Sequence, residues 1–282
     1  MQFKQKTAQL FVPDGLAVDE ALARTTHIGI GAHQDDLEIM AIDGVLTCFQ
    51  QDDQWFTGVV MTNGSGSSRT GVYGQYTNEQ MVEVRNREQK KAAFVGEYAA
   101  QVLLDYPSSA IKDGADQDPI DDIEMLLKAS RPDVVYTHNL ADKHTTHVGV
   151  AVKVIKAIRR LPESDRPKQV FGCEVWRDLD WMVDGDKIGF DVSPQEGVQY
   201  ALVGVFDSQI TGGKRYDLAT MGRRRANATY HASHSTDDTT GLVFAMDLTP
   251  LIEDTDKDIV SYVQAYIDRF KQDVQDRLGS IL

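Results

Sequence analysis

The sequence has little that ties it to an oxidising compartment or to a membrane. Only two of its 282 residues are cysteines, Cys48 and Cys173, and they lie far apart and outside any C-x-x-C pattern. This excludes a disulfide framework and a thiolate zinc site, and we expect both thiols to be buried in the core. No apolar run approaches the roughly 20 residues of a membrane span, and no signal-peptide core follows Met1. We therefore expect a cytoplasmic protein without a membrane span.

Positive charge is also scarce. The chain has 29 Lys and Arg residues against 43 Asp and Glu residues, a net charge of −14. Binding to a phosphate backbone needs clustered basic residues, so nucleic acid is not an expected partner. Internal repeats, low-complexity tracts and linkers are absent as well. Because 41% of the residues are hydrophobic and 26% are charged, we expect residues 1–282 to form one globular domain with a sizeable core.

What the chain does have is an alternation of strands and helices in its first half. The expected strands are 27–32, 55–62, 101–106 and 134–138, and the expected helices are 36–49, 77–98, 118–131 and 144–158. This order implies right-handed βαβ units. We therefore predict an α/β fold that is Rossmann-like, a mostly parallel sheet with helices on both faces. Residues 1–26 are polar and are expected to be irregular.

The second half of the chain is less regular, and we predict that it forms a carboxy-terminal α+β extension. The core would span about 27–160 and the extension about 161–282, with short strands near 170–175, 187–192 and 242–248 and an amphipathic helix over 259–274. A run of three arginines, residues 223–225, lies on another expected helix. Such a run is usually a solvated face, although in so acidic a chain it could also meet an anionic substrate or a neighbouring subunit of a homo-oligomer.

One stretch, Ala-His-Gln-Asp-Asp-Leu-Glu, concentrates charge where the first strand passes into a helix. Its Asp35 and Asp36 repel each other, and together with His33 their simplest partner is a divalent metal. His144 and His147 stand three residues apart at the start of the helix after the fourth strand. Ligands bind at the carboxyl edge of parallel sheets, where these loops meet. Two histidines, a third from the first loop and a carboxylate give a metal set with open positions, as in catalytic sites.

Other polar residues allow more than one interpretation. Asn63 and Arg69 lie in a long Gly/Ser loop after the second strand and are candidates for substrate binding. Arg85 and Glu88, three apart on a helix, could support the site or form a simple surface ion pair. His138, within the fourth strand, is more typical of a satisfied core residue than of a ligand, and we leave it out of the site.

A dinucleotide site is a further alternative, because Gly29-x-Gly31 follows a strand. The third glycine of that fingerprint is missing and Gln34 stands in its place. In addition, Asp35 and Asp36 would meet the pyrophosphate where backbone amides should be. We reject this interpretation.

Two motifs resemble a known family. Residues 32–38 resemble the His-Pro-Asp-Asp-x-Glu signature of the PIG-L/LmbE family of metal-dependent N-deacetylases, and His144-Thr-Thr-His147 resembles its second signature, His-x-x-His. The context agrees over about residues 27–155. Arg85 and Glu88 match an Arg-x-x-Glu helix of the family, and residues 132–135 match the strand before the second signature.

The resemblance implies a set of roles. His33, Asp36 and His147 would bind the metal, in the first place Zn²⁺, although such a set also accepts Fe²⁺ or Mn²⁺. Asp35 would be the general base, and His144, as an imidazolium, would stabilise the oxyanion and protonate the leaving amine. The implied reaction is removal of an N-acetyl group from a small N-acetylglucosamine-type sugar or glycoconjugate.

The chain departs from the family pattern in two places. Gln34 replaces the proline of the first signature, which we expect to loosen the turn, while Glu38 would support that turn from behind the ligands. Thr146 replaces the aspartate that would orient His144, and Asp142, also a candidate for substrate contact, could take over that role. These departures leave open a catalytically impaired, metal-dependent sugar-binding module. A structural metal site would need a fourth ligand from the chain.

Overall fold

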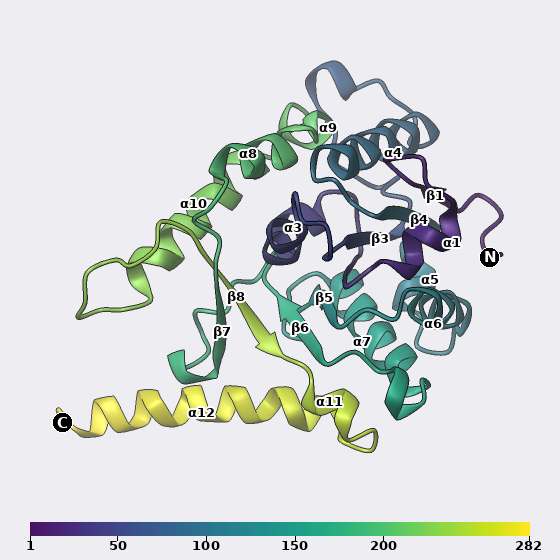
Figure 1. The fold of residues 1–282 in the computed structure, drawn as a ribbon. Helices are drawn as coiled ribbons and strands as arrows, with labels where there is room; N and C mark the ends of the chain where they lie inside the picture. The colour runs from purple at the N-terminus through teal and green to yellow at the C-terminus, as the bar shows by residue number, and fades with distance from the viewer.

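The computed structural model describes residues 1–282 as an eight-stranded sheet with helices on both faces (Figure 1). The strand order is β1-β4-β3-β2-β5-β6-β8-β7. The strands are β1 Gln9–Phe11, β2 His27–Gly31, β3 Phe56–Thr62, β4 Ala100–Tyr106, β5 Val134–His138, β6 Gln169–Cys173, β7 Lys187–Asp191 and β8 Leu242–Asp247. Strands β2 to β6 pair in parallel, while β1, β8 and β7 add antiparallel edges. The predicted α/β fold class is thus confirmed.

Helices account for most of the remaining chain. They are α1 Val18–Ala23, α2 Asp36–Met40, α3 Ile42–Cys48, α4 Asn78–Val95, α5 Ser108–Lys112, α6 Asp118–Ser130, α7 Thr145–Arg159, α8 Glu196–Gly204, α9 Asp207–Ile210, α10 Tyr216–Tyr230, α11 Pro250–Glu253 and α12 Ile259–Gly279, with 3₁₀ turns at Gly71–Tyr73, Glu163–Asp165 and Asp184–Asp186. None of these helices has the length and apolar character that crossing a membrane requires.

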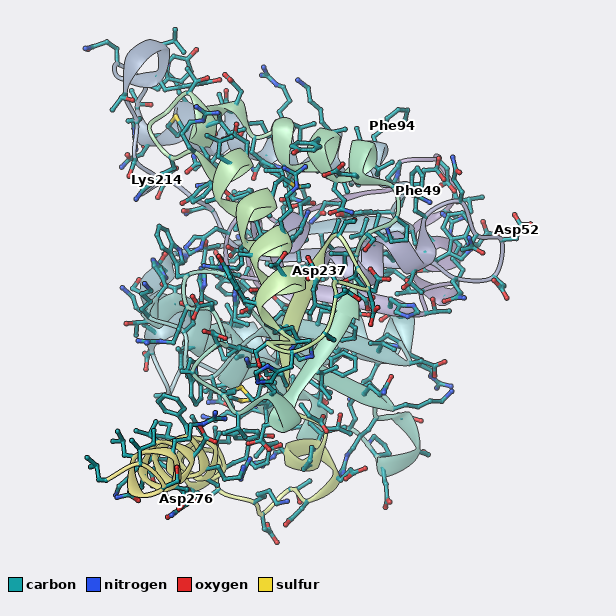
Figure 2. The ribbon with its side chains drawn as sticks, turned by 90° about the vertical axis from the view of Figure 1, so that its left-hand side faces the viewer. Phe49, Asp52, Phe94, Lys214, Asp237 and Asp276 are labelled. Carbon is teal, nitrogen blue, oxygen red and sulfur yellow. The ribbon has the colours of Figure 1, made fainter.

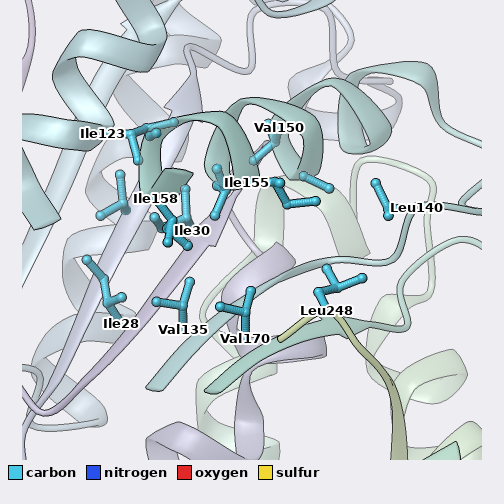
Figure 3. Close-up of a cluster of buried hydrophobic side chains, with 14 of the residues drawn as sticks. Ile28, Ile30, Ile123, Val135, Leu140, Val150, Ile155, Ile158, Val170 and Leu248 are labelled. Atoms are coloured by element: carbon cyan, nitrogen blue, oxygen red, sulfur yellow. The ribbon is translucent and has the colours of Figure 1, made fainter. Parts of the chain in front are cut away.

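The sheet separates two hydrophobic clusters. On one face, residues of the central strands such as Ile28 and Ile30 pack against α6 and α7, as Figure 3 shows for Ile123, Ile155 and Ile158. The opposite face packs against α2, α3, α4 and α8. Successive residues of a strand point to opposite faces, so a buried parallel strand must be apolar on both.

A glycine in β2 lets α2 approach the sheet. A Cβ atom built on Gly29 would lie 2.7 Å from the Phe56 ring and 3.0 Å from the Leu37 side chain. A larger residue would push α2 away from β2. Because α2 begins at Asp36, this close approach also determines how near the sheet the turn with His33, Asp35 and Asp36 lies.

Residues 1–26 are not irregular throughout, as the sequence suggested. Gln9–Phe11 forms the antiparallel edge strand β1 on β4, and Val18–Ala23 forms α1. Both elements are short and only half-buried, so their apolar periodicity is weak; pairing with β4 and packing on α6 decide their structure.

The extension completes the sheet that the core begins. β6 pairs with β5, β8 pairs with β6, and β7 pairs with β8. The helix α10 crosses above β8 and reaches α8 and α9, whereas α12 lies apart along one edge (Figures 1 and 2). Of the residues in α12 only Tyr266 is buried.

Candidate metal centre and active site

Five of the predicted site residues, Arg85 among them, line one pocket at the carboxyl edge of the sheet. His33, Asp35, Asp36 and His144 border a cavity of about 580 Å³, and His147 is fully buried against it. The first three come from the turn after β2 and the histidine pair from the start of α7, which follows β5. Because β2 and β5 are parallel neighbours, their carboxyl ends bring the two motifs together.

The turn after β2 is fixed by its own hydrogen bonds. The backbone N–H of His33 donates to Oδ2 of Asp36 at 2.7 Å, and the N–H of Asp36 donates to the carbonyl oxygen of His33 at 3.3 Å. Asp35 sits between them at φ 89°, in the left-handed region, where aspartate is tolerated better than most residues. Its N–H donates to Oε1 of Gln89 at 3.1 Å. The strained backbone is therefore held by α4.

Three ligand atoms form a triangle that fits a metal ion. Oδ2 of Asp36 lies 3.4 Å from Nδ1 of His33 and 3.5 Å from Nε2 of His147, and the two nitrogens are 3.2 Å apart. Ligands at about 2.0–2.2 Å in a tetrahedral arrangement lie about 3.3–3.6 Å from one another. The His33, Asp36 and His147 set therefore matches one face of a tetrahedron and leaves its fourth corner free.

The charge state of Asp36 suits a metal ligand. Burial by itself would raise the pKa of this carboxyl group, but the imidazoles of His147, His138 and His33 outweigh burial and hold its pKa well below the usual value. Asp36 is therefore ionised, and its anionic oxygen is directed at the same point as the two histidine nitrogens.

His138, which sequence reasoning left out, belongs to this cluster. Its ring is completely buried and stacks on His147 with ring centroids 3.8 Å apart. Its Nε2 accepts the N–H of Ala32 at 2.9 Å and lies 3.4 Å from Asp36 Oδ2. Burial lowers the pKa of His138 to about 4, so the ring is neutral and Nε2 is the acceptor. The available signal was that His138 ends β5 at the same sheet edge where His33 follows β2.

Arg85 faces Asp35 and not Glu88. The guanidinium group is buried, and its Nη2 donates to Oδ2 of Asp35 at 3.2 Å and to the carbonyl oxygen of Gln34. Glu88 instead accepts two hydrogen bonds from Ser208, from its N–H at 2.7 Å and from its hydroxyl at 2.6 Å. The surface ion pair considered from the sequence is therefore not formed. Arg85 thus connects α4 to the turn after β2, and Glu88 connects α4 to α9.

Burial and the neighbouring charges change the pKa of Asp35 in opposite directions. Burial raises its pKa well above the usual value, the neighbouring Arg85 guanidinium lowers it, and Asp36 raises it further. The group is not placed among the three converging ligand atoms. A carboxylate beside the candidate metal ligands, with a raised proton affinity, is suited to accepting a proton.

Asp142 holds His147 and not the ring of His144. Its Oδ2 lies 3.6 Å from Nδ1 of His147 and accepts the N–H of Trp176 at 3.0 Å. Its Oδ1 accepts the backbone N–H of His144 at 2.8 Å. Burial would raise the pKa of Asp142, but the nearby imidazole of His147 and the hydrogen bond from the His144 N–H lower it, so the carboxylate is ionised. The side chain of His144 keeps a buried Nδ1 without a partner, and burial lowers the pKa of that ring.

We expect Asp142→Asn to weaken metal binding about 10- to 100-fold, because carboxylates that orient a ligating imidazole contribute this much to metal affinity. Competition with a chromogenic chelator measures the change. Asp133→Asn, at an exposed position before β5, is the matched control. If Asp142→Asn binds the metal as tightly as the wild type does, the contact between Asp142 and His147 does not contribute to metal binding.

Three further residues from the sequence analysis stabilise loops. The side chain of Gln34, which we expected to loosen the turn, is buried, and its Nε2 donates to Oδ1 of Asn86 on α4 at 2.9 Å. Asn63 accepts the N–H of Ser65, and Arg69 donates to backbone oxygens of Ser65 and Tyr76. Neither Asn63 nor Arg69 lines the pocket, so the structure does not bring these two to the other site residues.

Glu38 and Arg224 support α2 from behind. Oε1 of Glu38 accepts from Tyr98 and Gln89, both at 2.8 Å, and burial raises the pKa of this carboxyl group to about 7. Its backbone oxygen accepts a hydrogen bond from Nη2 of Arg224 at 2.7 Å. Arg224, expected on a solvated face, is only 2% exposed and bridges α10 to the helix that begins with Asp36.

Together these features define an α/β protein with a candidate His/Asp/His metal centre at the carboxyl edge of its sheet. Residues 28–158 match the model of the PIG-L family, described as GlcNAc-PI de-N-acetylase. The matched segment is the part of the chain that holds both signatures, in agreement with the resemblance seen in the sequence. No curated protein sequence matches the chain.

Solved structures share the fold at low sequence identity. The 4-carboxy-2-hydroxymuconate hydratase GalB from Pseudomonas putida KT2440 aligns with a TM-score of 0.61 and 16% identity over 79% of this chain and 95% of its own. The N,N'-diacetylchitobiose deacetylase from Pyrococcus horikoshii aligns with 0.56 and 16% over 79% and 84%. The zinc-inhibited form of the teicoplanin deacetylase Orf2 aligns with 0.55 and 13% over 79% and 98%. These similarities concern the fold, which serves both a hydratase and deacetylases.

Proposed function

We propose that this protein is a metal-dependent N-deacetylase that releases acetate from an N-acetylglucosamine-type sugar or glycoconjugate. The observation that carries the proposal is the triangle of His33, Asp36 and His147 beside the uncoordinated carboxylate of Asp35, in a segment that matches the PIG-L family. The deacetylases among the structural relatives support the same reaction class. The pocket of about 580 Å³ lies in the size range of small-molecule sites.

His33, Asp36 and His147 would hold the metal. A bound divalent ion supplies Lewis acidity, which polarises the amide carbonyl and lowers the pKa of a water molecule. Asp35 takes the proton that attacking water must lose, because it is the carboxylate next to the ligand triangle that the ligand set does not use. Arg85 donates a hydrogen bond to Asp35 and fixes the orientation of its carboxylate.

His144 acts on the other side of the pocket in this proposal. Its ring lies 5.1 Å from the ring of His33, edge to face, and its N–H group can donate to the oxygen on which negative charge develops. Thr146 does not provide the carboxylate that would keep the ring charged. In the free protein the neutral ring is favoured, so its first contribution is a hydrogen bond.

We expect acetate release from at least one N-acetylated sugar after reconstitution with a single divalent metal. The measurement uses metal-free protein reloaded with one equivalent of Zn²⁺, Fe²⁺ or Mn²⁺, and a coupled assay for acetate. Because zinc inhibits one relative, a fourth sample receives excess Zn²⁺. No acetate from any sugar with any metal would overturn the deacetylase proposal. Sugar binding without release would favour the binding module.

A further inference from the structure

The pocket that holds the candidate metal ligands has more cations than carboxylates in its wall, although the chain as a whole is strongly acidic. Resting on the deacetylase function, we propose that the substrate carries an anionic group, a carboxylate or a phosphate, and that Lys112, Lys214 and Arg223 bind it. Five Lys and Arg residues line the pocket against three carboxylates. This excess is opposite in sign to the net charge of −14 of the protein.

The three carboxylates in the wall are already engaged. Asp36 faces three imidazoles and Asp35 faces Arg85. Glu174 is buried and accepts hydrogen bonds from the N–H groups of Leu179 at 2.7 Å and Phe244 at 3.1 Å, and from Asn227. Neither these three nor any other carboxylate forms an ion pair with the three cations of the proposed anion site. Lys112 and Lys214 therefore keep their charges available for a ligand, whereas the charge of Arg223 also acts on Glu174, where it opposes the rise that burial causes in the pKa of that carboxyl group.

The two cations from the extension are positioned by neighbouring groups. Lys214 lies just before α10 (Figure 2), with its Nζ 5.0 Å from the centroid of the Trp176 ring. Nη1 of Arg223 donates to the carbonyl oxygen of Val175, which leaves the rest of the guanidinium group available. Both side chains are half-buried. Partial burial strengthens the attraction of a cation for an anion, because water screens it less.

The same wall offers an apolar surface for a sugar ring. Trp176 packs edge to face against Tyr216 with ring centroids 6.1 Å apart, and both line the pocket. In this proposal a sugar ring packs there, and Lys214, whose Nζ lies 5.0 Å from the Trp176 ring, is close enough to meet its anionic substituent. Lys112 lies within the segment that matches the family, but Trp176, Lys214, Tyr216 and Arg223 follow it, so they can set substrate choice in this chain independently.

The test compares three N-acetylglucosamine derivatives: the methyl glycoside, the 1-phosphate and a glycoside with a carboxylic acid in its aglycone. We expect kcat/KM to be at least tenfold higher for one of the two anionic sugars than for the methyl glycoside, and the higher of the two identifies the anion. Lys214→Met should lower kcat/KM for that sugar about tenfold more than for the methyl glycoside, since a charge-assisted contact is lost. Lys156→Met, an exposed lysine on α7 outside the pocket, should change neither.

Equal kcat/KM for neutral and anionic sugars, or an equal loss for both in Lys214→Met, would overturn the anion site while leaving the deacetylase function intact. If no sugar releases acetate, the deacetylase function fails, and calorimetric binding of the same sugars to the wild-type protein decides the anion site. The anion site is supported if an anionic sugar binds more tightly than the methyl glycoside and Lys214→Met reduces that difference. It is contradicted if the three sugars bind equally or if none of them binds.

Discussion

Asp35→Asn is expected to lower kcat for acetate release by a factor of about 10²–10⁴, the usual contribution of a general base, while the protein keeps its metal. Asparagine has the shape of aspartate and tolerates the left-handed backbone at φ 89°, so the turn can remain intact. What is lost is a basic oxygen next to the ligand triangle. His33, Asp36 and His147, which do not include this oxygen, remain available to the metal.

Two measurements are needed together, kcat and the metal content of the purified variant. Asp133→Asn, exposed at the start of β5 and paired only with Lys168, serves as the control and should match the wild type in both. A kcat within about fivefold of the wild type would exclude Asp35 as the base, because it falls well short of a general base's contribution. Loss of metal together with activity would instead indicate that Asp35 is a ligand.

Arg224→Met is expected to destabilise the folded protein by about 2–4 kcal/mol and to weaken metal binding. Nη2 of Arg224 donates to the backbone oxygen of Glu38 at 2.7 Å, and Nη1 donates to Oε1 of Gln199 at 2.9 Å. Methionine fills much of the volume of arginine but has no hydrogen-bond donor. The buried oxygens of Glu38 and Gln199 would therefore each lose a charged donor, and each loss costs about 1–3 kcal/mol. Asp36 lies two residues before Glu38, so the metal ligand should lose part of its support.

The neighbouring arginine provides a matched control. Arg225 is exposed and pairs with the exposed Glu196, and such surface pairs contribute little. We expect Arg225→Met to change the unfolding free energy by no more than about 0.5 kcal/mol and to leave metal affinity unchanged. Denaturant unfolding and chelator competition on both variants give the comparison. Equal stability of the two variants would show that the contact between Arg224 and α2 is not needed.

Local sequence was sufficient for the fold class and for the candidate ligands. Alternating strands and helices imply a parallel sheet, and the loops after its strands meet at one edge. The two motifs could be located from the sequence because each is compact and lies just beyond a strand, whereas the choice of His33, Asp36 and His147 within them came from the resemblance to the PIG-L family. The structure brings those three residues together. The same reasoning failed for β1 and α1, since edge elements with few buried residues carry little periodicity.

Partners of the candidate ligands could not be assigned in this way. A histidine within a strand has the same sequence signature whether it is an isolated core residue or, like His138, stacks on His147. Charged pairs at helical spacing suggested that Arg85 faces Glu88, yet tertiary packing directs Arg85 to Asp35 and Glu88 to Ser208. In each case the contact joins two different elements, and Glu88 and Ser208 are 120 positions apart in the chain.

By itself, the sequence determined that a histidine and carboxylate cluster lies at a strand end, because the residues of a short motif stay together in any fold. Only the tertiary structure decided that Asp142 lies beside the His147 ring, that the Gln34 side chain bonds to α4, and that Arg224 is buried beneath α2. The physical reason is that a buried charge or amide is placed by whichever partner the packing supplies. Such partners come from other elements and leave no local pattern in the chain.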